Sequence, residues 1–93
     1  MLKTAHNVYK AEKLIKISFK YIDDDNVIKS IRITGDFFLY PEEGLDQLES
    51  SLIGTKIDRH SIKETIENAL QKCEPFGFDS ESLTDAILGC LKP

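Results

Sequence analysis

The chain has 93 residues, of which 41% are hydrophobic and 30% are charged, and its formal net charge is -4. A chain of this size forms one modest core, so we expect a single domain over residues 1–93 and no room for both a catalytic cleft and a substrate domain. No apolar run approaches the roughly 20 residues that span a bilayer, and residues 1–16 lack the apolar centre of a signal peptide. We therefore expect a soluble cytoplasmic protein without a membrane partner.

The charge is distributed unevenly along the chain. Residues 1–34 carry seven basic and four acidic side chains, whereas residues 35–93 carry five basic and twelve acidic ones. Nucleic-acid binding needs a clustered basic surface that neutralises phosphates, and the acidic second part would repel them. The pattern therefore disfavours a nucleic-acid partner and favours a protein partner of complementary charge.

Alternating side chains predict a β-hairpin near the N-terminus. Residues 13–22 alternate between apolar and polar positions, as a half-buried strand does, with an inward set of Ile15, Ile17, Phe19 and Tyr21. Residues 23–26 have the acidic and Asn composition of a turn, and residues 27–34 resume the alternation. Lys29 falls in phase with the inward positions, so the second strand either starts late or carries a bulge.

The next segment, residues 33–50, reads ITGDFFLYPEEGLDQLES. Gly35 and Asp36 favour a turn or bulge, after which residues 37–40 predict a short third strand. Successive strand residues face opposite sides, so Phe37 and Phe38 are expected to point in opposite directions, with only one ring joining the core. The other ring has to be covered by something other than the core. Alternatively, both rings are buried beneath helices and the segment is purely structural.

A helix is expected directly after the aromatic pair. Pro41 suits the first helical turn, and the two glutamates that follow it complement the positive end of the helix dipole. Gly54 is a typical stop signal. The apolar face of this helix is expected to contain Leu45, Leu48 and Leu52.

Two further helices are expected in the last third of the chain. The first has two candidate N-caps, Asp58 and Ser61, and an apolar stripe of Ile62, Ile66, Ala69, Leu70 and Cys73. The segment EPFGF interrupts it, and residues 79–80 are candidate caps for a last helix with the stripe Leu83, Ala86, Ile87, Cys90 and Leu91. Strands followed by helices predict an α+β fold, in which a small antiparallel sheet of about three strands carries three helices on one face.

The sequence contains no recognisable catalytic or metal-binding motif. There is no Gly-rich phosphate loop, GxSxG or HExxH, and Cys73 and Cys90 form no CxxC pair with histidines at ligand spacing. We interpret both cysteines as small core residues, with a reactive or cluster-binding thiol as the alternative. His6, in an N-terminus expected to fray, and His60 are interpreted as surface residues. No catalytic, cofactor-binding or metal-binding residue is predicted.

Three segments, in order, resemble the C-terminal accessory domain of lipoate-protein ligases: YKAEKLIKI, IRITGDFFLYPEE and LDQLESSLIGTKID. The resemblance covers roughly residues 8–70, and the stretch from GDFF to the leucine-spaced helix is its most specific part. Because Met1 lies just ahead of it, the chain resembles the separately encoded small subunit of split, archaeal-type ligases. The family fold is similar to that of sulfur-acceptor and iron-sulfur scaffold proteins.

The resemblance implies a non-catalytic accessory subunit, inactive alone, that forms a heterodimer with the catalytic subunit of an ATP-dependent lipoate-protein ligase. The catalytic subunit would bind lipoate, ATP and Mg, and this chain would bind no cofactor itself. It would be required to form lipoyl-AMP before transfer to a lysine of lipoyl-acceptor domains. Contacts with the catalytic subunit are expected at Tyr9, Lys10, Lys13, Gly35, Asp36, Phe37 and Phe38. The alternatives are a sulfur or iron-sulfur carrier that uses Cys73 or Cys90, and an interaction module of an unrelated enzyme.

Overall fold

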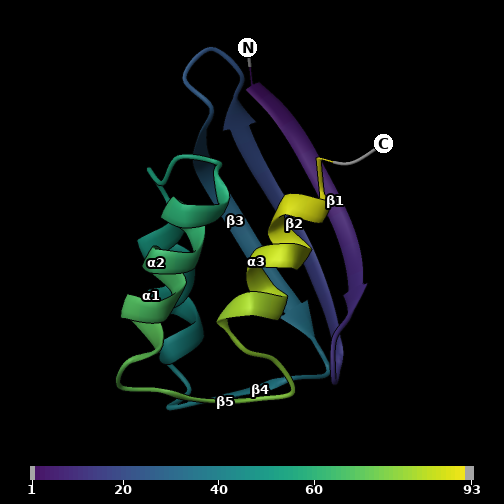
Figure 1. Ribbon diagram of the computed structural model, residues 1–93, viewed down its shortest axis with the longest axis vertical. Coiled ribbons are helices and arrows are strands. Elements are labelled where there is room, and N and C mark those ends of the chain that lie inside the picture. The colour runs from purple at the N-terminus through teal and green to yellow at the C-terminus, as the bar shows by residue number, and fades with distance from the viewer. Residues whose placement is uncertain (1, 92–93) are drawn as a thin grey trace.

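A three-stranded antiparallel sheet forms one layer of the protein (Figure 1). In the computed structural model, which describes residues 2–91, its strands lie in the order β1 (Leu2–Lys10), β2 (Leu14–Ile22) and β3 (Val27–Gly35). The alternation of β2 places Ile15, Ile17 and Phe19 in the core. The predicted hairpin of β2 and β3 is therefore confirmed.

The hairpin contains a bulge at Lys29, which was one of the two alternatives expected from its phase. The pairing register shifts between Lys20 and Tyr21 of β2, which leaves Lys29 as the extra residue on β3. Because of this extra residue, Ile28 and Ile31 are both buried although they are separated by an odd number of positions. The bulge thus keeps a charged side chain outside the core without breaking the strand.

Three helices cover one face of the sheet (Figure 1): α1 (Gly44–Leu52), α2 (Arg59–Leu70) and α3 (Ser80–Gly89). Helix α1 packs on β3, helix α3 packs on β1 and β2, and α2 packs against both other helices. The predicted apolar stripes supply the helical part of the core, namely Leu48, Leu52, Ile62, Ile66, Leu83, Ala86 and Ile87. The expected α+β class with helices on one face is confirmed. None of the helices within residues 2–91 is long and apolar enough to span a bilayer.

Side-chain caps begin the last two helices. A carboxylate oxygen of Asp58 accepts a hydrogen bond from the amide of Ser61 at 2.8 Å, and this bond holds the pKa of Asp58 below its usual range. Ser61, the other candidate cap of α2, lies inside the helix, so that alternative is wrong. Asp79 and Ser82 form a reciprocal capping box at the start of α3.

The third strand of the sheet is not the one predicted. Leu2–Lys10 forms β1 and pairs with β2 along its whole length, from Leu2 opposite Ile22 to Lys10 opposite Leu14. Only Ala5 of this edge strand is buried. The strand therefore has no clear alternation of apolar and polar residues from which the sequence could predict it. His6, expected in a frayed N-terminus, instead occupies a strand position, although its side chain is exposed.

Residues 38–40 form a separate element. Strand β4 (Phe38–Tyr40) pairs with β5 (Glu74–Phe76) in a two-stranded ribbon that lies across the end of the sheet where β3 ends (Figure 1). The expectation that β4 extends the main sheet was wrong, as was the interpretation of residues 74–76 as a mere helix breaker. Pro41 follows a cis peptide bond, and α1 begins at Gly44 rather than in a first turn at Pro41.

Candidate functional site

The outer surface of the β4–β5 ribbon presents three exposed aromatic rings. Phe38, Tyr40 and Phe76 are 58%, 60% and 53% exposed, respectively. Phe38 lies directly opposite Phe76 in the antiparallel register, and Tyr40 lies on the same side two residues further along β4. Leu39, between them, points inward and is buried. We call Phe38, Tyr40 and Phe76 the aromatic patch. Contiguous exposed rings of this kind are typical of interaction surfaces.

The two phenylalanines of the GDFF sequence have different surroundings. Phe37 is half-buried, and its ring packs edge-on against Phe78 with 5.0 Å between the ring centroids. Phe38 points out of the ribbon and joins the aromatic patch. The prediction that the rings face opposite sides is confirmed. The structure adds that Phe37 is the inward ring.

Gly35 makes the corner that precedes these rings. Its φ is +149°, and a Cβ atom at this position would lie 2.1 Å from the carbonyl oxygen of Leu14. The amide of Asp36 donates a hydrogen bond to the same oxygen at 3.0 Å. The contribution of Gly35 is therefore made through the backbone: it lets the chain turn closely past β2 and orients the two rings.

Lys13 joins the corner to the ribbon. Its amide donates a hydrogen bond to the carbonyl oxygen of Gly77 at 3.1 Å, just beyond β5. Lys13, Asp36 and Phe38 line one hollow of about 340 Å³ together with Phe76. Lys13 is thus a neighbour, on one surface, of two other predicted contact residues that are more than 20 positions away in sequence.

Tyr9 and Lys10 lie differently from the other predicted contact residues. Tyr9 is half-buried and packs against the core, and Lys10, its neighbour on β1, is exposed on the opposite face of the sheet. The structure therefore does not bring both side chains to the hollow that contains Lys13. Partner contacts of all seven predicted residues stay a prediction.

Exposed carboxylates border the aromatic patch. They belong to Asp36, Glu42, Glu43 and Glu74, and we call these four residues the acidic rim. Glu74 is paired with Tyr40 in the ribbon, Asp36 precedes β4, and the other two follow it. Within residues 2–91 none of the four has an ion-pair partner. Acidic side chains therefore outnumber the one basic side chain, Lys13, that lines the hollow beside the aromatic patch.

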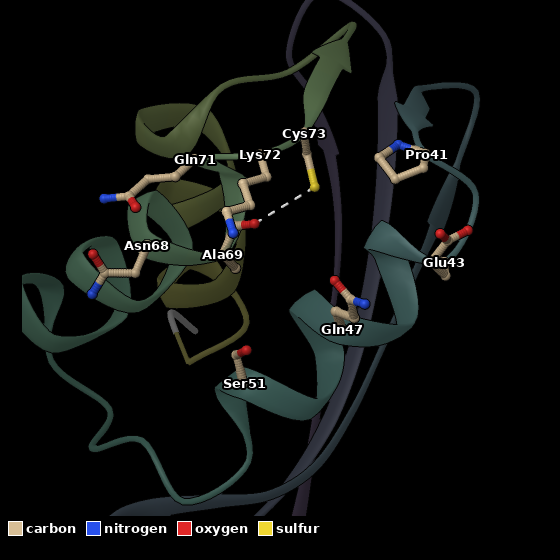
Figure 2. A pocket seen from close by; sticks show the side chains of 9 residues that line it. All are labelled: Pro41, Glu43, Gln47, Ser51, Asn68, Ala69, Gln71, Lys72 and Cys73. Atoms are coloured by element: carbon tan, nitrogen blue, oxygen red, sulfur yellow. Dashed lines mark hydrogen bonds between the residues drawn. The ribbon is translucent and has the colours of Figure 1, made fainter.

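Cys73 lies in a groove of about 270 Å³ between α1 and α2 (Figure 2). Figure 2 shows its sulfur directed toward the carbonyl of Ala69, to which the thiol donates a hydrogen bond at 3.6 Å. Cys90 makes the same contact with Ala86, and burial raises its pKa to about 11. A thiol with so high a pKa stays protonated at neutral pH and is a poor nucleophile. Both cysteines are half-buried against the core rather than fully inside it.

Comparison with known proteins identifies the family of this fold. The family model described as "Bacterial lipoate protein ligase C-terminus" matches residues 9–87. The chain belongs to this family. The match includes the GDFF corner and extends beyond the stretch that carried the sequence resemblance, through β5 and most of α3.

One curated protein and one solved structure, both from Thermoplasma acidophilum, are similar to this member of the lipoate protein ligase C-terminus family. "Lipoate-protein ligase A subunit 2" is 41% identical over 61 residues, and the alignment spans 60% of this chain and 63% of the relative's length. A chain of a solved structure is 29% identical to this chain, with a TM-score of 0.82. The match covers 94% of this chain and 97% of the solved chain. That structure is described as an archaeal lipoylation system with "a bi-partite lipoate protein ligase and its E2 lipoyl domain".

Sequence reasoning missed two rings of the patch in this member of the lipoate protein ligase C-terminus family. The sequence pattern marks Tyr40 only as part of a strand, and Phe76 lies in a segment whose Pro and Gly indicate a helix breaker. The period-two spacing of Phe38 and Tyr40 was an available signal that both share one face. No local signal pairs Phe76 with Phe38, because that contact joins distant parts of the chain.

No cluster suited to a metal ion lies in the described part of the chain. There, no three His, Cys, Asp or Glu side chains are grouped closely enough to hold one. His60 is nearly fully exposed and contacts Glu64, one turn along α2, at 3.3 Å. The aromatic patch, its acidic rim and the hollow beside Lys13 suit protein recognition.

Proposed function

We propose that this chain is the accessory subunit of a split lipoate-protein ligase. It binds a separate catalytic subunit and is required for the ATP-dependent activation of lipoate to lipoyl-AMP. The observation that carries the proposal is the likeness of nearly the whole chain to a chain of a bi-partite ligase, with a TM-score of 0.82. The exposed aromatic patch supports it, because this small domain leaves the three rings uncovered.

In the proposed reaction, the lipoate carboxylate attacks the α-phosphorus of ATP, forming the mixed anhydride lipoyl-AMP and releasing pyrophosphate. The amine of an acceptor lysine then attacks the anhydride carbonyl, and AMP leaves. The catalytic subunit binds lipoate, ATP and Mg, since this sequence has no nucleotide-binding motif. The accessory subunit contributes no reacting group.

Its effect in this proposal is conformational. A partner that binds the adenylation-competent conformation more tightly than the other shifts the population toward it by the difference in affinity. Each 1.4 kcal/mol of that difference changes the ratio of the two conformations by about tenfold. Activation therefore needs only a docking surface that discriminates between conformations.

The test is to mix the purified chain with a ligase catalytic subunit that lacks this domain. We expect one co-eluting heterodimer on a sizing column, and lipoyl-AMP formation that depends on both subunits. The chain alone is expected neither to hydrolyse ATP nor to attach lipoate. Transfer from supplied lipoyl-AMP serves as the control, because the catalytic subunit is expected to perform it alone. Separate peaks at micromolar concentrations would contradict the proposal.

A second candidate function, a sulfur or iron-sulfur carrier, is favoured by the position of Cys73 in the groove between α1 and α2. The accessory role predicts instead that both thiols are dispensable. Cys73→Ala and Cys90→Ala are each expected to lower the free energy of unfolding by about 1 kcal/mol, because each removes a half-buried group. Lipoyl-AMP formation with the catalytic subunit should persist in the double variant below its melting temperature. Loss of that activity in a folded double variant would favour the carrier.

A further inference from the structure

The proposed function leaves open which surface meets the catalytic subunit. We infer that the aromatic patch and its acidic rim form that docking surface, and that the catalytic subunit receives them in an apolar recess bordered by Lys or Arg side chains. The inference rests on the proposed function and deepens it. Its new elements are the anchoring roles of Tyr40 and Phe76 and the chemistry required of the partner.

The exposed area of the rings is suited to the centre of an interface. Each ring is more than half exposed, so together they offer an apolar area on the order of 300 Å². A stable interface buries roughly 800 Å² on each partner, with rings enriched at its centre and polar groups at its border. The aromatic patch therefore accounts for the centre of the interface, and the residues around the patch must supply the remaining buried area.

The acidic rim indicates what surrounds the recess on the partner. Its four carboxylates are exposed and have no ion-pair partner within residues 2–91, so they are free to pair with cations on another protein. Cations on the partner would complement these charges and attract the subunit during encounter. A second copy of this chain fits poorly, because a two-fold symmetric contact over the patch would bring two acidic rims together.

The surface is held in place before binding. The side chain of Leu39, in the middle of β4, is buried and anchors the ribbon to the core. Phe37, which directly precedes β4, packs on Phe78. The hydrogen bond from Lys13 to Gly77 fixes the chain just beyond β5. Rings on a preorganised strand pair lose less conformational freedom on binding than rings on a mobile loop. The backbone that carries the rings is therefore ordered before binding, as expected beneath interface anchors.

The first experiment measures the dissociation constant of the heterodimer for Phe76→Ala and Tyr40→Ala. We expect Phe76→Ala to weaken binding by about 30-fold or more, as truncation of an interface anchor does. The matched control is Ile53→Ala, since Ile53 is 51% exposed but follows the opposite end of α1, and it should change binding less than about twofold. Melting curves identify any variant that fails to fold, and Tyr40→Ala then provides the independent test.

The second experiment tests the acidic rim. Glu74→Gln is expected to slow association and to reduce its dependence on salt concentration, while the dissociation rate changes little. Asp24→Asn is the control, because it removes the same charge from the exposed turn at the other end of the hairpin. If Glu74→Gln and the wild type associate at the same rate and with the same salt dependence, the inferred Lys or Arg side chains around the partner's recess are wrong.

The outcomes separate this inference from the proposed function. If the wild-type chain does not bind the catalytic subunit, the proposed function fails. If it binds and supports adenylation, but Phe76→Ala and Tyr40→Ala bind equally well, the proposed function survives and this docking surface is wrong. A homodimer of the wild type that Phe76→Ala dissociates would assign the patch to self-association and would also overturn the inference.

Discussion

Replacing Phe37 with Ala is expected to lower the free energy of unfolding by about 3 kcal/mol, whereas replacing Phe38 with Ala should leave it nearly unchanged. Phe37 packs on Phe78 beside the core, and its removal leaves a cavity. Phe38 is 58% exposed, and its removal uncovers little. The expected cost of Phe38→Ala lies instead in binding, at about 2 kcal/mol or more of heterodimer affinity.

Denaturant unfolding of each variant, together with its heterodimer affinity, separates these effects. Phe38→Ala should reduce lipoyl-AMP formation when the subunits are mixed near the wild-type dissociation constant, and excess subunit should restore it. Transfer from supplied lipoyl-AMP should be unaffected. If both variants only destabilise the fold and neither alters binding or adenylation while folded, the GDFF corner is purely structural.

A second large effect is expected for Gly35→Ala, which should lower the free energy of unfolding by about 3 to 5 kcal/mol. The new Cβ would meet the carbonyl oxygen of Leu14 at 2.1 Å, and the φ of +149° is unfavourable for alanine. Relief of the clash requires β3 to move away from β2. That movement also disturbs the hydrogen bond from Asp36 to Leu14.

Gly54→Ala is the matched control for this substitution. Gly54 also has a positive φ, +87°, but no heavy atom beyond its two chain neighbours lies within 4 Å of the Cβ position. The control therefore carries backbone strain without a clash, and we expect it to cost only about 1 kcal/mol. Denaturant unfolding of both variants gives the comparison. A Gly35→Ala variant no less stable than Gly54→Ala would show that the close approach to Leu14 is readily relieved.

Local patterns predicted much of this fold. The alternation around Ile15 and Phe19 depends on residues close in sequence, and the structure confirms it. For Lys29 and for the start of α2 the sequence left two alternatives each, and the structure selects the bulge and the Asp58 cap. The three helices follow equally from apolar stripes that repeat with the helical period. In these elements, local preference and tertiary packing agree.

The elements that were missed depend on distant partners. Strand β1 has a single buried side chain, Ala5, so its conformation follows from pairing with β2 rather than from its own pattern. Strand β5 contains Pro75 and is only three residues long, so neither composition nor period predicts it. The candidate site was missed for the same reason, because Phe76 and Phe38 are far apart in sequence and become neighbours only in the folded chain.

The pairing of β4 with β5 also links assembly to folding. The aromatic patch combines residues near positions 38 and 76, so an unfolded or half-folded chain does not possess it. Under the docking proposal, the catalytic subunit binds the native state and not the unfolded state, so binding stabilises the native state by mass action. The stabilisation is about 2.7 kcal/mol when the free concentration of the catalytic subunit is 100 times the dissociation constant. The accessory subunit without its partner would then be degraded by proteases faster than the subunit in the heterodimer. The abundance of this chain in a cell would therefore follow that of the catalytic subunit.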